Sequence, residues 1–511
     1  MLHRAYTLFA ALFLLGAAVF AQESSVLTIT PLGTYTHGGY DEGASEISAY
    51  HAASRTLYVV NAGADAIDML DISDPSAPAL KGSIDLEGIG SPNSVAVYGD
   101  IVAVAAANDQ EPGVVAFYSV DGALISQVTV GALPDMLTFT PDGSRVVTAN
   151  EGEPSDDYSV DPEGSVSIVD VSAGVENATV TTVSFADAAL DPAINIYGPN
   201  ATPAQDLEPE YVAISADSST AYVIAQENNA LLVIDLASGT LSASFWLGTK
   251  DLSQPGSGFD GGKDDGVINI ANWPVQALYR PDAIVFVNAP DGTPYLITAN
   301  EGDTRDYDGY SEEGELGETP LDAAAYPNAD ELAAESAIGG LEILTSVGDA
   351  DGDGDIDQMH ISGARSFSVW NADGSLAWDS GDQLERLIAE LLPEEFNSTN
   401  EENGSFDDRS DNAGPEPEGL AVGTINGVQY LFVGLERIGG FVVYDLTTLP
   451  QPTYVTYVNN RDFEGDAEAG TAGDLGPEGL TFISAEESPN GAALLVLTNE
   501  ISGTTTIFEI R

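Results

Sequence analysis

Short runs of apolar residues alternate with turn-forming residues along nearly the whole chain, and one phrase recurs. It consists of a proline or small residue, an acidic or amide residue, a short apolar strand, a turn, and a second strand that ends near an acid. Seven copies can be aligned, and they begin at Ser45-Glu46, Pro92-Asn93, Pro134-Asp135, Pro209-Glu210, Pro281-Asp282, Pro417-Glu418 and Pro477-Glu478. A third strand ending on Asp and a more variable fourth strand follow in most copies. Four short strands per unit are typical of a β-propeller. The sequence therefore predicts an all-β fold, a single seven-bladed β-propeller over residues 26–511.

The two ends of the sequence complement each other. An unmatched strand at 26–35 precedes the first copy, and the last copy stops after its third strand at 505–510. If the N-terminal strand completes the last blade, the ring closes without an open edge. We therefore predict closure of the propeller by the N-terminal strand.

The fifth copy is much longer than the others and is predicted to carry two insertions. The first covers residues 302–363 and the second residues 382–414. A short helix is predicted at 383–392, because its apolar residues recur at helical spacing. These residues are Leu384, Leu387, Ile388 and Leu391.

Residues 1–21 combine early positive charge with an apolar run and a small residue at Ala21. This pattern predicts a cleaved secretory signal peptide, and the alternative is an uncleaved membrane anchor. No comparable apolar run follows, and the sequence ends at Arg511 without an anchor pattern. We expect an exported protein, periplasmic or extracellular, with no membrane span in its mature form. No coiled-coil or docking-helix pattern occurs outside the insertions, so a monomer is expected.

Charge and cysteine content narrow the chemistry. The chain has 14 Lys and Arg against 82 Asp and Glu, a formal net charge of −68, and no cysteine. Binding of nucleic acid or an anionic membrane through a basic surface is excluded. Disulfides, thiol nucleophiles and Cys-ligated metals are excluded as well. Divalent cations are the expected small partners.

The repeat places acids at two positions that should lie close together. In an antiparallel blade the start of the first strand lies beside the end of the second. The first set is Glu46, Asn93, Asp135, Glu210, Asp282, Glu418 and Glu478; the second is Asn61, Asp109, Glu151, Glu227, Glu301, Glu436 and Glu500. Carboxylates gathered on one rim around a channel repel each other, and Ca²⁺ or another divalent metal would relieve that repulsion. The alternative is that duplication copied a turn-forming residue. The predicted rim ligands are Glu210, Glu227, Glu301, Glu418, Glu436, Glu478 and Glu500.

A second metal pattern lies in the first insertion. Its acids alternate with small residues, with Gly354 at the sixth position and Ile356 at the eighth, as in an EF-hand-like Ca²⁺ loop. The acids are Asp349, Asp351, Asp353, Asp355 and Asp357. The twelfth position is His360 rather than Glu. A structural Ca²⁺ loop is therefore predicted over 349–360, against the alternative of a solvated acidic turn.

The scarce arginines concentrate on the predicted acidic rim. Six of the ten that follow residue 21 are expected there: Arg280, Arg305, Arg365, Arg409, Arg437 and Arg461. Each could pair with a nearby carboxylate. Alternatively, Arg365, Arg437 and Arg461 could bind phosphate together with a metal, since guanidinium groups and divalent ions both match its oxygens.

Five motifs carry a family resemblance. They are Leu-Glu-Arg-Ile-Gly-Gly at 435–440, Gly-Pro-Glu-Gly-Leu at 476–480, Asn-Glu-Ile-Ser-Gly-Thr-Thr at 499–505, Gly-Ala-Arg-Ser-Phe-Ser-Val-Trp at 363–370, and Thr-Ala-Asn-Glu-Gly at 148 and 298. They resemble the choice-of-anchor I family, which is similar to the mesenchyme-specific cell-surface glycoprotein type and belongs with YVTN-like and WD40-like propellers. The resemblance implies a secreted or surface-displayed bacterial protein, and some members carry an alkaline-phosphatase label.

Two functions remain open at this point. The first is a secreted, Ca²⁺-loaded binding or surface module that turns nothing over. The second is a metal-dependent phosphoesterase, in which rim carboxylates hold Ca²⁺ and the three arginines stabilise charge on phosphate. The fold itself does not choose between them.

Overall fold

The computed structural model describes residues 27–263, 265–334 and 337–511. The predicted signal peptide at 1–21 lies outside the described residues. The regular structure of the described chain consists mainly of short strands, joined by turns, with three short α-helices: α1 (Pro203–Asp206), α2 (Ala329–Leu332) and α3 (Gln383–Leu391). The predicted all-β class is confirmed.

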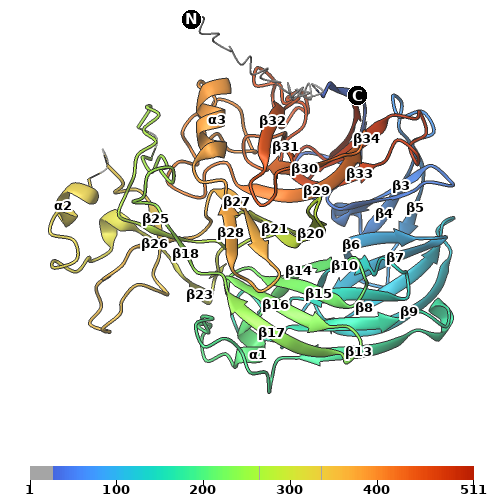
Figure 1. The fold of residues 1–511 in the computed structure, drawn as a ribbon, viewed down its shortest axis with the longest axis horizontal. Coiled ribbons are helices and arrows are strands. Elements are labelled where there is room, and N and C mark those ends of the chain that lie inside the picture. Colours follow the sequence, from blue (N-terminus) through green and yellow to red (C-terminus); the bar gives the residue numbers. More distant parts are fainter. Residues whose placement is uncertain (1–26, 264, 335–336) are drawn as a thin grey trace, which may run out of the picture.

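Within the described residues, seven four-stranded antiparallel sheets follow one another along the chain (Figure 1). Sheet 1 contains β2 (Ser48–His51), β3 (Thr56–Asn61), β4 (Ala66–Asp71) and β5 (Ala79–Asp85), and sheet 2 contains β6 (Ser91–Tyr98), β7 (Ile101–Asn108), β8 (Glu111–Ser119) and β9 (Leu124–Ala132). Sheet 3 contains β10 (Pro134–Phe139), β11 (Arg145–Asn150), β12 (Ser165–Asp170) and β13 (Thr179–Ser184), and sheet 4 contains β14 (Pro209–Ile214), β15 (Thr220–Ala225), β16 (Ala230–Asp235) and β17 (Thr240–Trp246). Sheet 5 contains β20 (Ile284–Asn288), β21 (Pro294–Asn300), β27 (Ser366–Asn371) and β28 (Leu376–Asp379). Sheet 6 contains β29 (Pro417–Ile425), β30 (Val428–Leu435), β31 (Phe441–Asp445) and β32 (Thr453–Val458), and sheet 7 contains β33 (Pro477–Ile483), β34 (Ala493–Asn499), β35 (Thr504–Ile510) and β1 (Ile29–Thr36).

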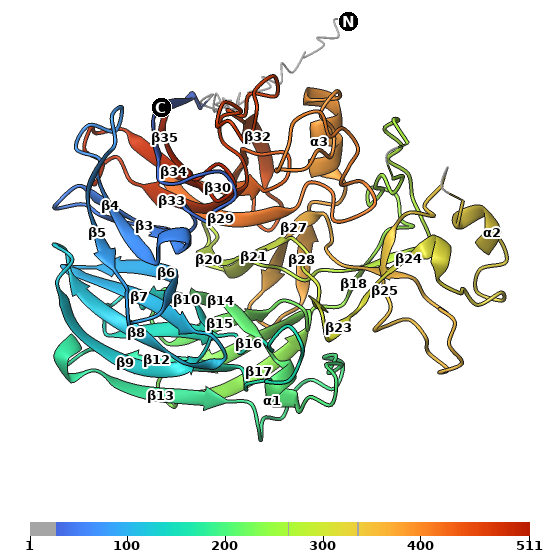
Figure 2. The ribbon, with the colours of Figure 1, turned by 180° about the vertical axis from the view of Figure 1, so that it is seen from behind.

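The sheets fan around a common centre with their first strands innermost (Figure 2). Neighbouring first strands contact each other in the order β2, β6, β10, β14, β20, β29 and β33, and β33 in turn contacts β2. The N-terminal β1 pairs antiparallel with β35, from Ile29 opposite Ile510 to Thr36 opposite Thr504. The arrangement is propeller-like.

The hydrophobic core lies between neighbouring sheets because successive side chains of a strand point to opposite faces. On β15, Ala221 and Val223 pack with residues of sheet 3, whereas Tyr222 and Ile224 pack with residues of sheet 5. The inner strands are therefore apolar on both faces. Their polar groups are left at the strand ends, where the predicted acids lie.

The predicted elements lie close to those of the structure. The strand predicted at 505–510 is β35, the helix predicted at 383–392 is α3, and the strand predicted at 26–35 corresponds to β1, which begins three residues later at Ile29. These elements were predicted correctly because each has a strong apolar period and flanking turn residues.

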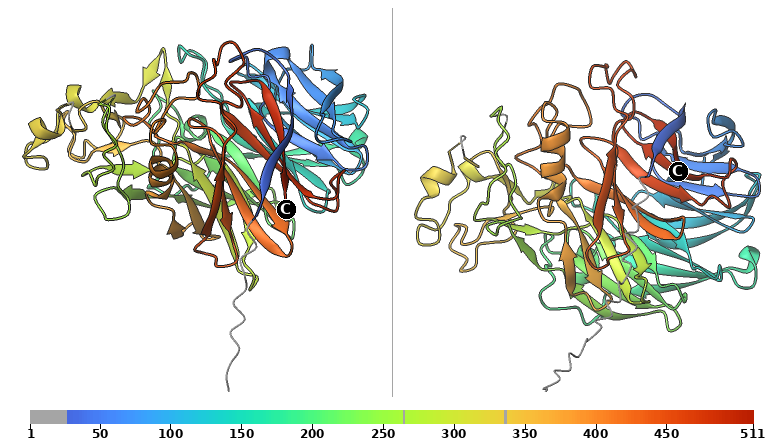
Figure 3. Two further views of the ribbon diagram at one scale, coloured as in Figure 1. Left: turned by 90° about the horizontal axis from the view of Figure 1, so that it is seen from above. Right: turned by 45° about the horizontal axis from the view of Figure 1, so that its top comes forward.

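Small elements outside the seven sheets project to one side of the molecule (Figure 3). Between β21 and β27 lie β22 (Asp306–Tyr307), β23 (Tyr310–Ser311), β24 (Glu313–Glu315), α2, β25 (Glu342–Leu344) and β26 (His360–Ile361). Strand β26 joins β18 (Thr249–Asp251) and β19 (Gln276–Leu278) in a three-stranded sheet. Strands β18 and β19 were not predicted, because strands of three residues show no hydrophobic period. Three 3₁₀ turns occur at Ala62–Ala64, Val175–Asn177 and Leu316–Glu318.

Candidate metal sites at the ends of the inner strands

A recurring irregularity places the acids that open the inner strands. The pairing of first and second strands shifts register directly after the opening residues of five sheets. The shifts lie between Pro92 and Ser94, Pro134 and Leu137, Pro209 and Val212, Pro417 and Leu420, and Pro477 and Leu480. A β-bulge leaves a residue unpaired and changes the direction of its side chain. The residue after each proline, for example Glu210 or Glu418, therefore has no partner in the pairing of the first and second strands.

Four of these acids line a central cavity of about 230 Å³. They are Glu46, Asp135, Asp282 and Glu478, accompanied by Asn93 and Tyr211. Burial, followed by the neighbouring carboxylates, raises the pKa of Glu46 to about 9 and that of Glu478 to about 8. Burial also raises the pKa of Asp135 and that of Asp282 to about 7. Five of the seven residues of the first predicted set therefore line the central cavity, and Glu210 and Glu418 do not. The four acids of the cavity are not among the tight carboxylate clusters.

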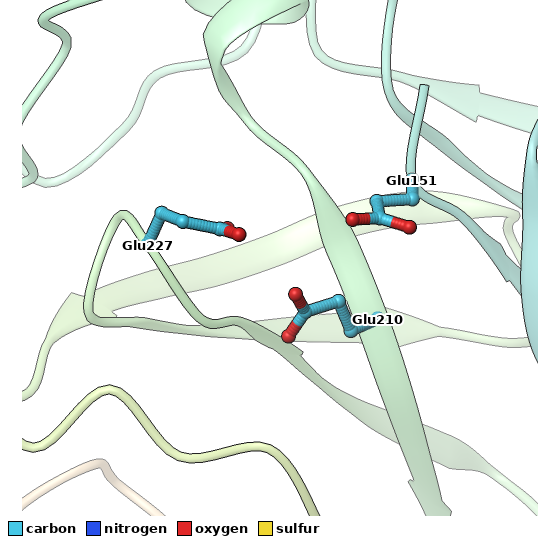
Figure 4. A group of neighbouring side chains, drawn as sticks. All are labelled: Glu151, Glu210 and Glu227. Carbon is cyan, nitrogen blue, oxygen red and sulfur yellow. The ribbon is translucent and has the colours of Figure 1, made fainter. Parts of the chain in front are cut away.

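Glu151, Glu210 and Glu227 form the first tight group, which we call cluster A (Figure 4). Glu151 follows β11 of sheet 3, Glu210 opens β14 of sheet 4, and Glu227 follows β15 of sheet 4. One carboxylate oxygen from each lies within 4.8 Å of the others. Because Ca²⁺ holds its oxygen ligands at about 2.3–2.6 Å, oxygens at this separation can share one ion.

Cluster A is buried, and its charge is not neutralised by a hydrogen-bonded cation. Glu151, Glu210 and Glu227 are 8%, 7% and 4% exposed. Oε2 of Glu210 and Oε2 of Glu227 are buried and accept no hydrogen bond from the described residues. Burial, followed by Glu227 and Glu151, raises the pKa of Glu210 well above its ordinary value. A buried oxygen without a donor is costly, and a bound cation removes that cost.

The arginine nearest cluster A is occupied by other acids. Arg305 donates from Nη2 to Glu208 Oε2 at 2.6 Å and from Nη1 to Asp206 Oδ1 at 2.8 Å, and all three side chains are almost fully buried. Arg280 pairs with Glu312 in the same way, at 2.7 Å. These arginines tie the first insertion to sheets 4 and 5; their charges lower the pKa of Glu227, against the larger effect of burial, but neither forms an ion pair with cluster A.

Glu301, Glu416 and Glu436 form the second tight group, which we call cluster B, again with one oxygen of each within 4.8 Å of the others. Here arginines are directly involved. Arg409 Nη2 lies 2.6 Å from Glu416 Oε1, and Arg437 Nε donates to Glu416 Oε2. Although burial opposes it, these two guanidinium groups hold the pKa of Glu416 below its ordinary value.

The rest of cluster B is less well compensated. Arg437 Nη1 lies 3.1 Å from Glu436 Oε1, but Glu436 Oε2 is buried and accepts no hydrogen bond from the described residues. Glu301 accepts from Gln226 Nε2 at 2.9 Å. Glu301, Glu416, Arg409 and Arg437 also line a pocket of about 140 Å³. Cluster B therefore combines carboxylates and guanidinium groups at a partly open position.

Three other predicted rim ligands lie outside both clusters. Glu418 is 7% exposed, and its Oε2 also accepts no hydrogen bond from the described residues. Burial, then Glu478, Glu436 and Glu301, raise its pKa well above the ordinary value. Glu478 lines the central cavity, and Glu500 is half-buried.

The predicted Ca²⁺ loop divides into two groups of carboxylates. Asp349, Asp351 and Asp353 form an exposed group, whereas Asp355 and Asp357 form a half-buried group with Asp322. Asp349 accepts from the backbone N–H groups of Gly352 at 2.7 Å and of Gly354 at 3.0 Å. A bridge between Leu321 and Ile356 brings Asp322 to the loop. Asp322 thus supplies a carboxylate from outside the loop.

Two of the three predicted phosphate-binding arginines are occupied elsewhere. Arg365 is buried, donates to the main-chain oxygens of Asp260 and Ser410, and lies over the ring of Phe259. Arg461 donates to the main-chain oxygens of Thr399 at 2.8 Å and Arg437 at 2.9 Å. Only Arg437 of the three contacts a carboxylate cluster, which leaves the predicted three-arginine phosphate site without structural support.

Three residues of these clusters were not among the predicted ligands: Glu151, Glu416 and Asp322. Glu151 stood in the second acidic set, and Glu416 opens a Glu-Pro-Glu sequence that matches Glu208-Pro209-Glu210. Both could have been found by comparing the copies. Asp322 carries no sequence signal, because only the fold of the insertion brings it to the loop.

Comparison with known proteins identifies relatives. The model of the family described as "Choice-of-anchor I domain" matches residues 46–449. Gigasin-3a of Magallana gigas is 30% identical over 188 residues, which are 35% of this chain and 66% of that protein. The mesenchyme-specific cell surface glycoprotein of Strongylocentrotus purpuratus is 28% identical over 205 residues, which are 34% of this chain and 26% of that protein. The chain thus spans just under two thirds of the first relative and about a quarter of the second.

Solved structures with similar folds have low sequence identity. Hydrazine synthase of Kuenenia stuttgartiensis aligns with a TM-score of 0.48 at 14% identity, covering 93% of this chain and 97% of that one. The β-propeller domain of Cps50 (Swd1) from Myceliophteria thermophila aligns with a TM-score of 0.44 at 9% identity, covering 94% and 100%. Among the described residues, every helix is too short or too polar to cross a membrane.

Proposed function

We propose a function from the premise that this chain belongs to the choice-of-anchor I family. It is an extracellular or surface-associated binding module, built as a seven-bladed β-propeller that β1 closes, and it holds a divalent cation at cluster A. The surface location is supported by the name of the sea-urchin relative, a cell surface glycoprotein, and by the signal peptide predicted at 1–21. The blades are supported by the seven sheets and the pairing of β1 with β35.

One observation carries the cation proposal. Cluster A brings three buried carboxylates together, and two of their oxygens have no donor among the described residues. Carboxylates of this kind either take up protons or bind a cation. Three glutamates that each bind through one or two oxygens supply much of the shell of six to eight that Ca²⁺ prefers. Ca²⁺ is therefore the preferred ion, and Mg²⁺ is the competitor to test.

The loop in the first insertion supports a second, structural Ca²⁺. Its ligands would be Asp355 and Asp357 of the loop with Asp322, so that one ion would connect two distant parts of the insertion. The two groups of acids surround a turn whose N–H groups are already satisfied by Asp349. An ion here would stabilise the fold of the insertion and would leave clusters A and B unchanged.

Calorimetric titration of Ca²⁺ into chelator-treated protein tests the proposal. We expect Glu210→Gln to lose a binding event that Glu163→Gln keeps. Glu163 is a suitable control because it is an exposed acid on the same connection that carries Glu151. Identical isotherms for Glu210→Gln and the wild type would refute cation binding at cluster A.

A phosphoesterase is the second candidate, and one observation favours it. Arg409 and Arg437 line the same pocket as Glu301 and Glu416, so that guanidinium groups and carboxylates meet beside a cavity. Their pairing with Glu416 instead favours the binding module. Hydrolysis of a phosphomonoester that requires Ca²⁺ and is lost in Arg437→Ala, but not in the exposed Arg386→Ala, would establish the enzyme.

A further inference from the structure

The Glu-Pro-Glu sequence occurs in two sheets with the same division of roles. At 208–210 the first glutamate pairs with Arg305, and at 416–418 the first glutamate pairs with Arg409 and Arg437. In both places the second glutamate opens an inner strand. Its Oε2 is buried and has no hydrogen-bond donor among the described residues.

The other positions correspond as well. Glu227 and Glu436 follow the second strands of sheets 4 and 6, and each has a buried Oε2 without a donor. Glu151 and Glu301 follow the second strands of the preceding sheets 3 and 5. The same register shift follows Pro209 in sheet 4 and Pro417 in sheet 6. Two equivalent arrangements therefore lie two sheets apart.

Carboxylates outnumber guanidinium groups at cluster B. The three carboxylates of the cluster act on the neighbouring Glu418 through Glu436 and Glu301, and Arg409 and Arg437 are the cations that pair with the cluster. If these four carboxyl groups are all ionised, they exceed the two guanidinium groups by two charges, and Asp303, Glu313 and Glu342 of the adjoining pocket add to the excess. A buried excess of this size needs an ion or protons. Glu436 and Glu418 are 4% and 7% exposed, so water does not compensate their free oxygens well.

We propose that cluster B also holds a divalent cation, in addition to the ion of cluster A. It is bound through Glu301, Glu436 and the free oxygen of Glu418, and Glu416 links the ion to Arg409 and Arg437. The proposal rests on the proposed function, since it extends the ion of cluster A to an equivalent position. The two sites differ in their surroundings. The second ion would lie beside guanidinium groups and a pocket, and so would bind more weakly than the ion of cluster A.

Equilibrium dialysis against radioactive Ca²⁺ measures the number of ions bound per chain. We expect Glu418→Gln to bind one ion fewer than the wild type, Glu210→Gln one fewer, and the double variant two fewer. Glu46→Gln is the matched control and should lose none. Glu46 lies two residues before the inner strand β2 and lines the central cavity, and the second strand of its sheet ends in Asn61 rather than in an acid.

The outcomes separate the two proposals. Unchanged ion number and affinity in Glu418→Gln, with a loss in Glu210→Gln, would overturn the second site and leave cluster A standing. A loss in Glu418→Gln alone would overturn cluster A and keep cluster B. Circular dichroism verifies that each variant is folded. If Glu418→Gln fails to fold, Glu301→Gln decides, because a glutamine there can still bond to Gln226.

Discussion

Clusters A and B are built from equivalent strand ends, but they treat the first glutamate of Glu-Pro-Glu differently. Near cluster A, Glu208 pairs with Arg305 away from the three converging carboxylates. In cluster B, the equivalent Glu416 is itself one of the converging groups, held by Arg409 and Arg437. Among the described residues, no cation forms an ion pair with cluster A, whereas cluster B is partly neutralised by Arg409 and Arg437. The comparison shows that one repeated motif can yield an uncompensated ion site and a compensated one.

The largest expected effect on stability separates two substitutions in the Glu-Pro-Glu sequences, Glu416→Gln and Glu210→Gln. In chelator, Glu416→Gln should lower the free energy of unfolding by about 3–5 kcal/mol. It leaves the half-buried Arg409 without its carboxylate and leaves Arg437 with Glu436 alone. Glu210→Gln should change it by no more than about 1 kcal/mol, because the carboxyl it replaces has no cationic partner. Urea unfolding measures both. Equal losses in the two variants would mean that the clusters are not compensated differently.

Removal of divalent cations should have the next largest effect. An ion present at 100 times its dissociation constant stabilises the folded state by about 2.7 kcal/mol per site. We expect chelator to lower the free energy of unfolding of the wild type by this amount for each of the two proposed sites, cluster A and cluster B. Glu210→Gln and Glu418→Gln should each respond less than Glu46→Gln. A melting temperature that is the same with Ca²⁺ and with chelator would contradict ion binding at both clusters.

The difference between the clusters also explains which residues of the site could be predicted from the sequence and which could not. Glu210, Glu227, Glu301 and Glu436 were identified because they occupy fixed positions of a repeat, and the repeat is set by the period of the strands. The compensation was not visible, because Arg409 and Arg437 reach Glu416 from separate connections. Arg365 was assigned to phosphate, but Phe259, which covers it, lies in a segment whose short strands were not predicted. Partners fixed by local periodicity can be inferred from sequence, and partners fixed by packing of insertions cannot.

The central cavity should make stability depend on pH when metal is absent. Burial raises the pKa of Glu46 to about 9, and that of Asp135 and that of Asp282 to about 7, so the folded protein holds more protons than the unfolded chain. Stability should then fall as pH rises from about 5 to 9, by at most about 1.4 kcal/mol per pH unit for each group. Urea unfolding in chelator across this range measures the slope.

The variant Glu46→Gln sharpens this test. It removes the carboxyl whose pKa is raised furthest in the cavity, so the slope above pH 7 should become shallower. Its ion binding should stay that of the wild type. A slope equal to that of the wild type would show that Glu46 is ionised in the folded protein at neutral pH.

The smallest effect is expected in the insertion, where the acids are exposed or half-buried. Asp322→Asn should weaken Ca²⁺ binding by the loop and lower the free energy of unfolding by about 1 kcal/mol or less, since exposed charges contribute little to global stability. The local effect should be clearer. Ca²⁺ should protect residues 345–358 of the wild type from limited proteolysis and should protect them less in Asp322→Asn. Asp330→Asn is the control, because Asp330 is an exposed acid of the same insertion outside the loop clusters. If Ca²⁺ protects the loop equally in Asp322→Asn and Asp330→Asn, the loop binds Ca²⁺ through its own five aspartates alone. Any further stabilisation of the protein by Ca²⁺ must then come from clusters A and B.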